Sequence, residues 1–152
     1  MKAEFEFQSI TSGYADTVVV REISGHLGSG QVLGILGRNG VGKTTLLKAL
    51  SGFLPLMGGS VTWQGKDLST IPSFARLSKG IAYAPQENIV FGDLSVRDNL
   101  FLHLFDKKQA RYDYLLSKFP RLNERMTQRA GALSGGERKL LSFVRTMGLA
   151  MP

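Results

Sequence analysis

The sequence predicts an α/β fold in which a β-rich first part precedes an α-helical second part. Short apolar, alternating or β-branched segments occupy the first 90 residues, and apolar residues recur at helical spacing after Ser95. A glycine-rich loop also separates an apolar run from the first helical segment. We therefore expect a β-rich core over residues 1–90 and a helical subdomain over residues 91–150, without internal repeats.

The expected strands all lie in the first part. Phe5 and Phe7 alternate with Glu4 and Glu6, which is typical of a half-buried strand. The segment before the glycine-rich loop is continuously apolar, which is typical of a strand that is buried on both faces. The five expected strands cover residues 5–7, 17–20, 31–36, 61–63 and 80–84.

Helical signals begin at the glycine-rich loop and dominate after Ser95. Lys43–Ser51 carries three leucines at helical spacing and is followed by Gly52, a common helix stop. Ser95 and Asp98 fit a capping box, and the apolar stripe that follows consists of Val96, Leu100 and Leu104. Further helices are expected over residues 112–119 and 122–129, separated by Pro120, and from Ser134 to about Leu149.

The charge of the chain lies mostly in its second half. Its 152 residues carry a net charge of +7, of which residues 76–152 contribute +6. This excess indicates a solvated helical face, a surface for anionic lipids or an acidic partner, or a nucleic-acid surface. No RNP-like pattern of aromatic residues accompanies the basic ones, so nucleic acid is not the expected partner.

Several other classes of protein are not expected. The chain has no cysteine, which excludes disulfides, thiolate catalysis and zinc–cysteine sites. Its first residues carry Glu4 and Glu6 and lack the apolar region of a signal peptide. We find no apolar run that approaches the roughly 18 residues of a membrane-spanning helix.

The glycine-rich loop Gly37–Thr44 matches G-x-x-x-x-G-K-[ST], the phosphate-binding loop of P-loop NTPases. Glycines let the backbone amides point inward, and the helix that follows adds a positive dipole. We expect Lys43 to reach the β- and γ-phosphates and the Thr44 hydroxyl to bind Mg²⁺. The alternative is a glycine-rich turn without a ligand. The expected phosphate-binding residues are Gly37, Asn39, Gly40, Gly42, Lys43, Thr44 and Thr45.

A second motif, Leu133–Glu137, has the sequence Leu-Ser-Gly-Gly-Glu, and its serine lies 91 residues after Lys43. Ser134 and Glu137 again fit a capping box, so one interpretation is simply a well-capped helix. A capping box needs no paired glycines, however, and a helix start with bare amides also attracts anions. Two such helix starts in one chain suggest a head-to-tail dimer. Each nucleotide would then contact Ser134, Gly135 and Gly136 of the second nucleotide-binding subunit.

With these two motifs, the chain resembles the nucleotide-binding subunit of an ABC transporter over essentially its whole length. Gly37–Thr44 matches the Walker A motif and Leu133–Glu137 the family signature. Gln86 lies 43 residues after Lys43, where the family has its Q-loop glutamine, and Tyr14 lies where it has an aromatic residue that stacks on adenine. Residues 58–61 and 93–100 are similar to the subunits of branched-chain amino-acid or urea-type importers.

The resemblance implies a P-loop core with an N-terminal antiparallel β part and a helical subdomain. It implies ATP and Mg²⁺ as ligands, with Lys43 and Gln86 in catalytic roles and Thr44 and Gln86 at the metal. It also implies a separate transmembrane permease subunit as partner, and a peripheral position on the cytoplasmic face of the cell membrane. The implied function is ATP binding and hydrolysis that powers import of amino acids or similar small polar solutes.

The chain departs from the family pattern after the signature. The family has an apolar strand that ends in Asp-Glu, and a histidine beyond it, but no Asp or Glu follows Glu137 here. His26 and His103 both precede the signature, as do the apolar runs that end in Asp93 and Asp106. We therefore expect a partial cassette, without the C-terminal part of the core, that hydrolyses ATP poorly or not at all, is marginally stable and self-associates.

Two other functions stay open. The chain could be a non-catalytic nucleotide-binding fragment or regulator, which the missing carboxylates favour. It could also be a soluble ABC protein that acts on ribosomes or DNA, which the basic second half allows.

Overall fold

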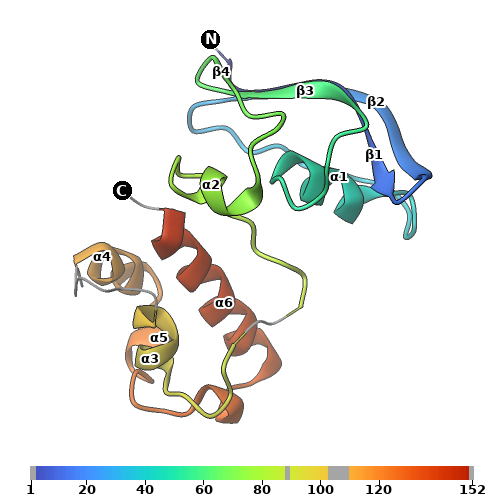
Figure 1. Cartoon of the computed structure of the whole chain (residues 1–152). Coiled ribbons are helices and arrows are strands. Elements are labelled where there is room, and N and C mark those ends of the chain that lie inside the picture. The colour runs from blue at the N-terminus through green and yellow to red at the C-terminus, as the bar shows by residue number, and fades with distance from the viewer. Residues whose placement is uncertain (1–2, 88–89, 103–109, 151–152) are drawn as a thin grey trace. The chain divides into compact units, whose positions relative to one another are not determined.

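The computed structural model describes residues 3–87, 90–102 and 110–150, which form two compact units, residues 1–81 and 82–152 (Figure 1). The first unit is built on a four-stranded antiparallel sheet of order β2-β1-β3-β4. Its strands are β1 (Ala3–Tyr14), β2 (Thr17–Gly28), β3 (Gly58–Trp63) and β4 (Lys66–Asp67), and its helices are α1 (Lys43–Leu50) and α2 (Ser73–Leu77).

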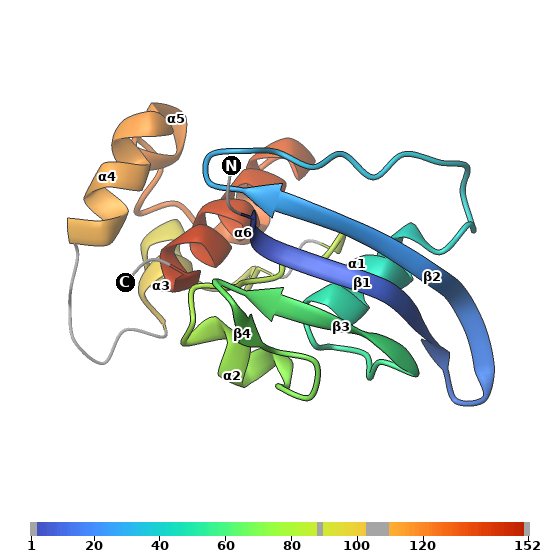
Figure 2. The ribbon, with the colours of Figure 1, turned by 90° about the horizontal axis from the view of Figure 1, so that it is seen from above.

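The helix that follows the glycine-rich loop, α1, packs against β1 and β2 (Figure 2). The apolar side chains of α1 and of one face of the sheet form a single core, which removes them from water. Its fully or nearly fully buried members are Phe7, Ile10, Val20, Leu46, Ala49, Leu50, Val61 and Leu68. The structure thus confirms the strands predicted at residues 5–7, 17–20 and 61–63 and the helix predicted from Lys43.

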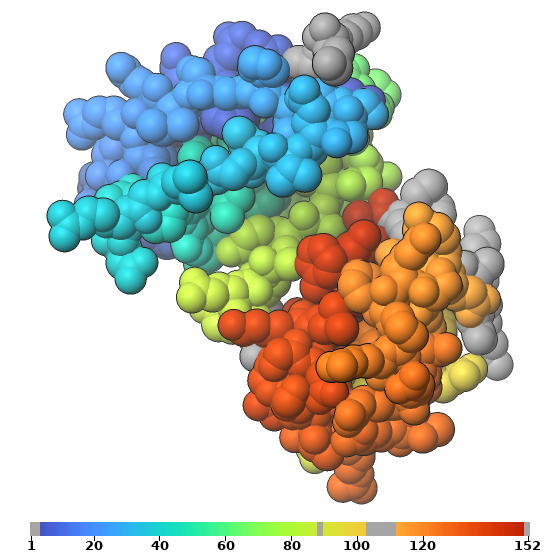
Figure 3. All heavy atoms as spheres, turned by 180° about the vertical axis from the view of Figure 1, so that it is seen from behind, coloured from blue at the N-terminus to red at the C-terminus, as the bar shows by residue number. Residues whose placement is uncertain are grey.

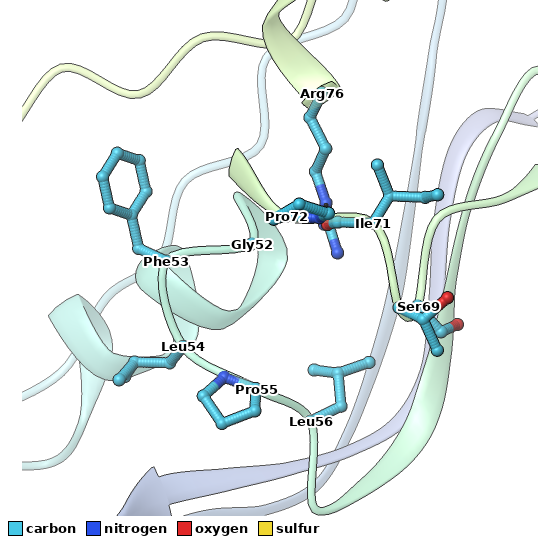
Figure 4. Close-up of a pocket in the computed structure, with 10 residues that line it drawn as sticks. Gly52, Phe53, Leu54, Pro55, Leu56, Ser69, Ile71, Pro72 and Arg76 are labelled. Carbon is cyan, nitrogen blue, oxygen red and sulfur yellow. Dashed lines mark hydrogen bonds between the residues drawn. The ribbon is translucent and has the colours of Figure 1, made fainter. Parts of the chain in front are cut away.

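A buried arginine fixes the end of α1. Arg76 of α2 is only 1% exposed, and its guanidinium donates to the carbonyls of Leu50, Leu68 and Ile71 at 2.6 Å each. Figure 4 shows Arg76 beside Ile71, Pro72 and Gly52, at the wall of a cavity of about 370 Å³. Because Leu50 is the last residue of α1, Arg76 places a positive charge at the negative end of that helix.

Two predicted strands are wrong. Residues 31–36 and 80–84 have no strand conformation, and Val32 and Leu36 are 96% and 94% exposed. Figure 3 shows the segment that leads to α1, in cyan, on the surface of the first unit. A strand that is buried on both faces needs a hydrogen-bonded neighbour. Within the described residues no strand pairs with either segment, so their apolar patterns alone do not produce strands.

The second unit is helical, as predicted. Its helices are α3 (Val96–Phe101), α4 (Ala110–Lys118), α5 (Pro120–Asn123) and α6 (Gly135–Ala150), and a 3₁₀ turn covers Ala130–Ala132. They share one apolar core made of Val96, Leu100, Tyr112, Leu115, Leu116, Leu122, Ala130, Leu133, Leu141 and Val144. The capping box of Ser95 and Asp98 is present at the start of α3. The predictions for His103, Leu104 and Asp106 fall outside the described residues.

The helix predicted over residues 122–129 is wrong beyond Asn123. Turns follow instead, and their backbone bonds to the start of α3: Val96 N donates to Gln128 O, and Ala130 N donates to Leu94 O, both at 2.9 Å. These hydrogen bonds come from residues distant in the sequence, which local helix propensity does not register. No helix in the parts of the chain that the structure describes is long and apolar enough to cross a membrane.

Candidate functional site

The glycine-rich loop ends in a left-handed residue that begins α1. Gly42 is the N-cap, with φ 94° and ψ 11°, a conformation that L side chains rarely adopt. A Cβ at this position would also lie 2.8 Å from Val20 Cγ1 and 3.1 Å from Val19 Cγ1. Position 42 therefore requires glycine for two reasons: the left-handed backbone conformation and the close approach of the loop to β2.

The start of α1 is left open to an anion. Gly42 has no side chain, so it cannot cap the first amides of the helix, which have no acceptor within the helix. The structure describes every residue of α1, and its first turn carries no acidic side chain. The uncompensated amides and the positive end of the helix dipole both favour a negatively charged group here.

Lys43 adds a full positive charge to this helix start. Its ammonium donates to Gly37 O at 2.8 Å and to Arg38 O at 2.7 Å, so the side chain folds back across the loop. An ammonium has three donors, and a third is left for a further acceptor. The lysine thus lies beside the loop amides, as a phosphate-binding role requires.

The two threonines after Lys43 differ in exposure. Thr44 is exposed, whereas Thr45 is buried, at 6% exposure, so a nucleotide would contact Thr45 through its amide. The amides, the ammonium and the Thr44 hydroxyl fit the phosphates of a nucleotide. For Mg²⁺ the protein offers fewer ligands, because the described residues contain no group of three His, Cys, Asp or Glu side chains. Mg²⁺ keeps several waters and also binds the phosphates of its substrate, so the Thr44 hydroxyl would be one ligand among these.

The remaining predicted site residues lie in both units. Tyr14 ends β1 in the first unit, and its side chain is 47% exposed, as a stacking surface for a base would need to be. Gln86 belongs to the second unit, where it lies in a bend and is exposed. The first unit therefore holds Tyr14 and residues 37–45, and the second holds Gln86 and the signature.

The signature motif forms the start of α6. Leu133 is buried at 3% exposure, whereas Ser134, Gly135 and Gly136 are exposed. Ser134 N donates to Glu137 Oε2 at 2.9 Å, and Glu137 N donates to Ser134 Oγ at 3.3 Å, which confirms the predicted capping box. These serine contacts hold the pKa of Glu137 below its ordinary value, with a smaller contribution from the positive charge of Arg125.

The paired glycines of the signature are not required by the fold around them. A Cβ built on Gly135 or Gly136 meets no described atom within 4 Å, and neither residue has a positive φ. Glycine in a helix costs roughly 0.5–1 kcal/mol relative to alanine. The two glycines therefore lower the stability of the helix slightly. They lie at an exposed place, where the space that they leave would serve only a group from outside this unit.

Sequence reasoning missed two arginines near these motifs. Arg76 anchors the end of α1, and Arg125 forms an ion pair with Glu137, with Nε and Oε1 3.3 Å apart. Arg125 lies twelve residues before Glu137, a spacing that signals no contact within one helix. Only the turn after α5 brings the two side chains together.

Comparison with known proteins agrees with the resemblance of the two motifs to the ABC transporter family. The family model described as "ABC transporter" matches residues 20–150. The ATP-binding protein BraG of Pseudomonas aeruginosa, named for high-affinity branched-chain amino acid transport, is 35% identical over 145 residues, which are 93% of this chain and 62% of that protein. The lipopolysaccharide export ATP-binding protein LptB of Escherichia coli is 34% identical over 149 residues, 92% of this chain and 61% of LptB.

Solved structures agree on the fold. A nucleotide-free ATP-binding cassette of an ABC transporter matches with a TM-score of 0.80 at 22% identity, over 97% of this chain and 66% of that one. A cassette in its ADP conformation matches with a TM-score of 0.84 at 24% identity, over 98% and 66%. The chain spans about three fifths of the length of the curated relatives it matches. With the model match over most of its length and its two motifs, the chain belongs to the ABC transporter family.

Proposed function

We propose that this chain binds the phosphates of Mg²⁺-ATP at residues 37–45 and serves as an ATP-binding subunit of a transporter. The observation that carries the proposal is the start of α1, where a left-handed glycine leaves the first amides uncapped beside the Lys43 ammonium. When bound, Mg²⁺ supplies positive charge that neutralises the phosphate oxygens. Thr44 would contribute the protein's hydroxyl to that ion.

The other predicted residues receive roles within the same proposal. Tyr14 would stack on the adenine, because its ring is half exposed at the end of β1. Ser134, Gly135 and Gly136 would contact the nucleotide of a second subunit in a head-to-tail dimer. The exposed glycines at the start of α6 support this role, since the unit around them does not need them. A transmembrane permease would be the membrane partner, and the chain would then lie on the cytoplasmic face.

For the cargo we propose import of amino acids or similar small polar solutes. Two relatives, BraG and the LivF protein of Archaeoglobus fulgidus, are named for branched-chain amino acid transport, at 35% and 33% identity. Lipopolysaccharide export is the second candidate, because LptB proteins are 32–34% identical over similar lengths. Uptake of labelled leucine by cells that carry the Lys43→Ala chain distinguishes the two candidates. If the chain serves amino-acid import, leucine uptake should be lost. If it serves lipopolysaccharide export, leucine uptake should be unchanged and the cell surface should carry less lipopolysaccharide.

Photolabelling with 8-azido-ATP and Mg²⁺ tests the nucleotide site itself. The azide sits on the adenine, so we expect labelled peptides from the end of β1 around Tyr14, and we expect excess ATP to prevent the labelling. Tyr14→Ala should lower the labelling at this site, and Tyr114→Ala, a second exposed tyrosine, should not. Labelling that ATP does not prevent, or that Tyr14→Ala leaves unchanged, would contradict the proposed adenine contact.

A further inference from the structure

Arg125 is a cation held close to the start of the signature helix. Its Nε lies 3.3 Å from Glu137 Oε1, and its Nη1 donates to Gln128 Oε1 at 3.2 Å. Backbone hydrogen bonds close the turn that carries it and join the turn to the start of α3: Gln128 N donates to Arg125 O, and Val96 N donates to Gln128 O, each at 2.9 Å. The guanidinium is therefore carried by a hydrogen-bonded turn and not by a free loop end.

Glu137 connects this cation to the signature serine. One carboxylate oxygen faces Arg125, and the other accepts the amide hydrogen of Ser134 at 2.9 Å. The Glu137 amide in turn donates to Ser134 Oγ at 3.3 Å. Arg125, Glu137 and Ser134 thus form a chain of three contacts that ends at the residue proposed to meet the nucleotide of the second subunit.

This arrangement contains an electrostatic conflict. A carboxylate in the first turn of α6 uses the same positive helix end that would attract a phosphate, and two anions repel each other. The first turn of α1 has no such carboxylate. A nearby cation that offsets the charge of Glu137 reduces this repulsion. Arg125 is in contact with the carboxylate, and the positive charge of Arg121 acts on it as well.

We infer that Arg125 is a positioning residue for nucleotide binding: through Glu137 it fixes Ser134 and offsets the carboxylate charge, so that the start of α6 accepts a phosphate. This inference rests on the proposed function of residues 134–136. Arg125 acts on the carboxylate and does not itself bind the phosphate. Because Arg125 is 43% exposed, water screens the pair, and loss of the arginine should weaken phosphate binding by roughly two- to fivefold.

The first test follows the ionisation of Glu137 in the full ¹⁵N-labelled chain, through the pH dependence of the Ser134 amide resonance. We expect the midpoint to lie below the ordinary value of 4.5 and to rise toward it in Arg125→Ala. Arg125→Lys should restore part of the shift. Arg129→Ala is the matched control, because it removes an exposed arginine from the same segment, and it should leave the midpoint unchanged. An unchanged midpoint in Arg125→Ala would refute the coupling.

The second test titrates the same chains with pyrophosphate and follows the amides of Ser134, Gly135 and Gly136. Arg125→Ala should weaken binding at these amides two- to fivefold, and in a Glu137→Gln background the same substitution should have no effect. An equal loss in both backgrounds would mean that Arg125 binds phosphate directly, and no wild-type response at these amides would overturn the inference. The amides of residues 37–45 report the proposed ATP site separately, so failure there identifies failure of the proposed function.

Discussion

The paired glycines of the signature lead to a prediction in which stability and function change in opposite directions. Alanine at positions 135 and 136 places two methyl groups where no described atom lies within 4 Å, so the fold gains helix propensity without a clash. Because both residues lie in the first turn, the gain is at the lower end of the usual range, about 0.5 kcal/mol each. A total of about 1 kcal/mol corresponds to a rise in Tm of roughly 4–8 °C in a unit of this size.

The same substitution should reduce association with a second subunit, since the methyl groups occupy the space proposed for its nucleotide. We would measure Tm by calorimetry and association by sedimentation velocity with and without Mg²⁺-ATP. Gly148→Ala is the matched control on the same helix, because a Cβ there would overlap the ring of Tyr112, and it should lower Tm. A lower Tm for the double alanine variant, or a higher Tm with unchanged ATP-dependent association, would refute the reasoning.

Three further predictions follow from single residues. Arg76→Met leaves three carbonyl acceptors without their buried donor, so it should lower the free energy of unfolding in urea melts by about 3–5 kcal/mol. The control Arg21→Met replaces an exposed arginine and should change this free energy by less than about 0.5 kcal/mol. Gly42→Ala should cost more than Gly65→Ala in the same melts, since both have positive φ but only position 42 meets β2; equal costs would contradict the packing. Because the folded pKa of Glu137 is lowered, its stabilisation is present above pH 4.5 and is lost as pH falls, so the difference in Tm between wild type and Glu137→Gln should shrink between pH 5 and 3.

Local signals predicted those parts of the chain that depend on local chemistry. Each of these signals depends on a few adjacent residues, and each element forms: the alternation at Phe5 and Phe7, the capping boxes at Ser95 and Ser134, and the loop before Lys43. In these cases the hydrogen bonds join residues within one turn or one hairpin, so the sequence window contains both partners.

Other features depend on partners that are distant in the sequence. Residues 31–36 have the apolar pattern of a buried strand, yet no described strand pairs with them, and Leu36 stays exposed. Residues 124–128 have helical spacing but bond to the start of α3 instead. The same limit applies to the site: the buried contacts of Arg76 and the ion pair of Arg125 join different elements, which no local pattern indicates.

The central claim, that the start of α1 binds the phosphates of ATP, is tested most directly by calorimetric titration of the full chain with Mg²⁺-ATP. We expect binding in the wild type and a loss of at least about tenfold in Lys43→Ala, which removes one charge-assisted contact of roughly 1.5–3 kcal/mol. Lys48→Ala, a lysine in the last turn of the same helix, should bind as the wild type does. Equal affinity in the wild type and Lys43→Ala, or no binding by a folded wild-type chain, would contradict the account.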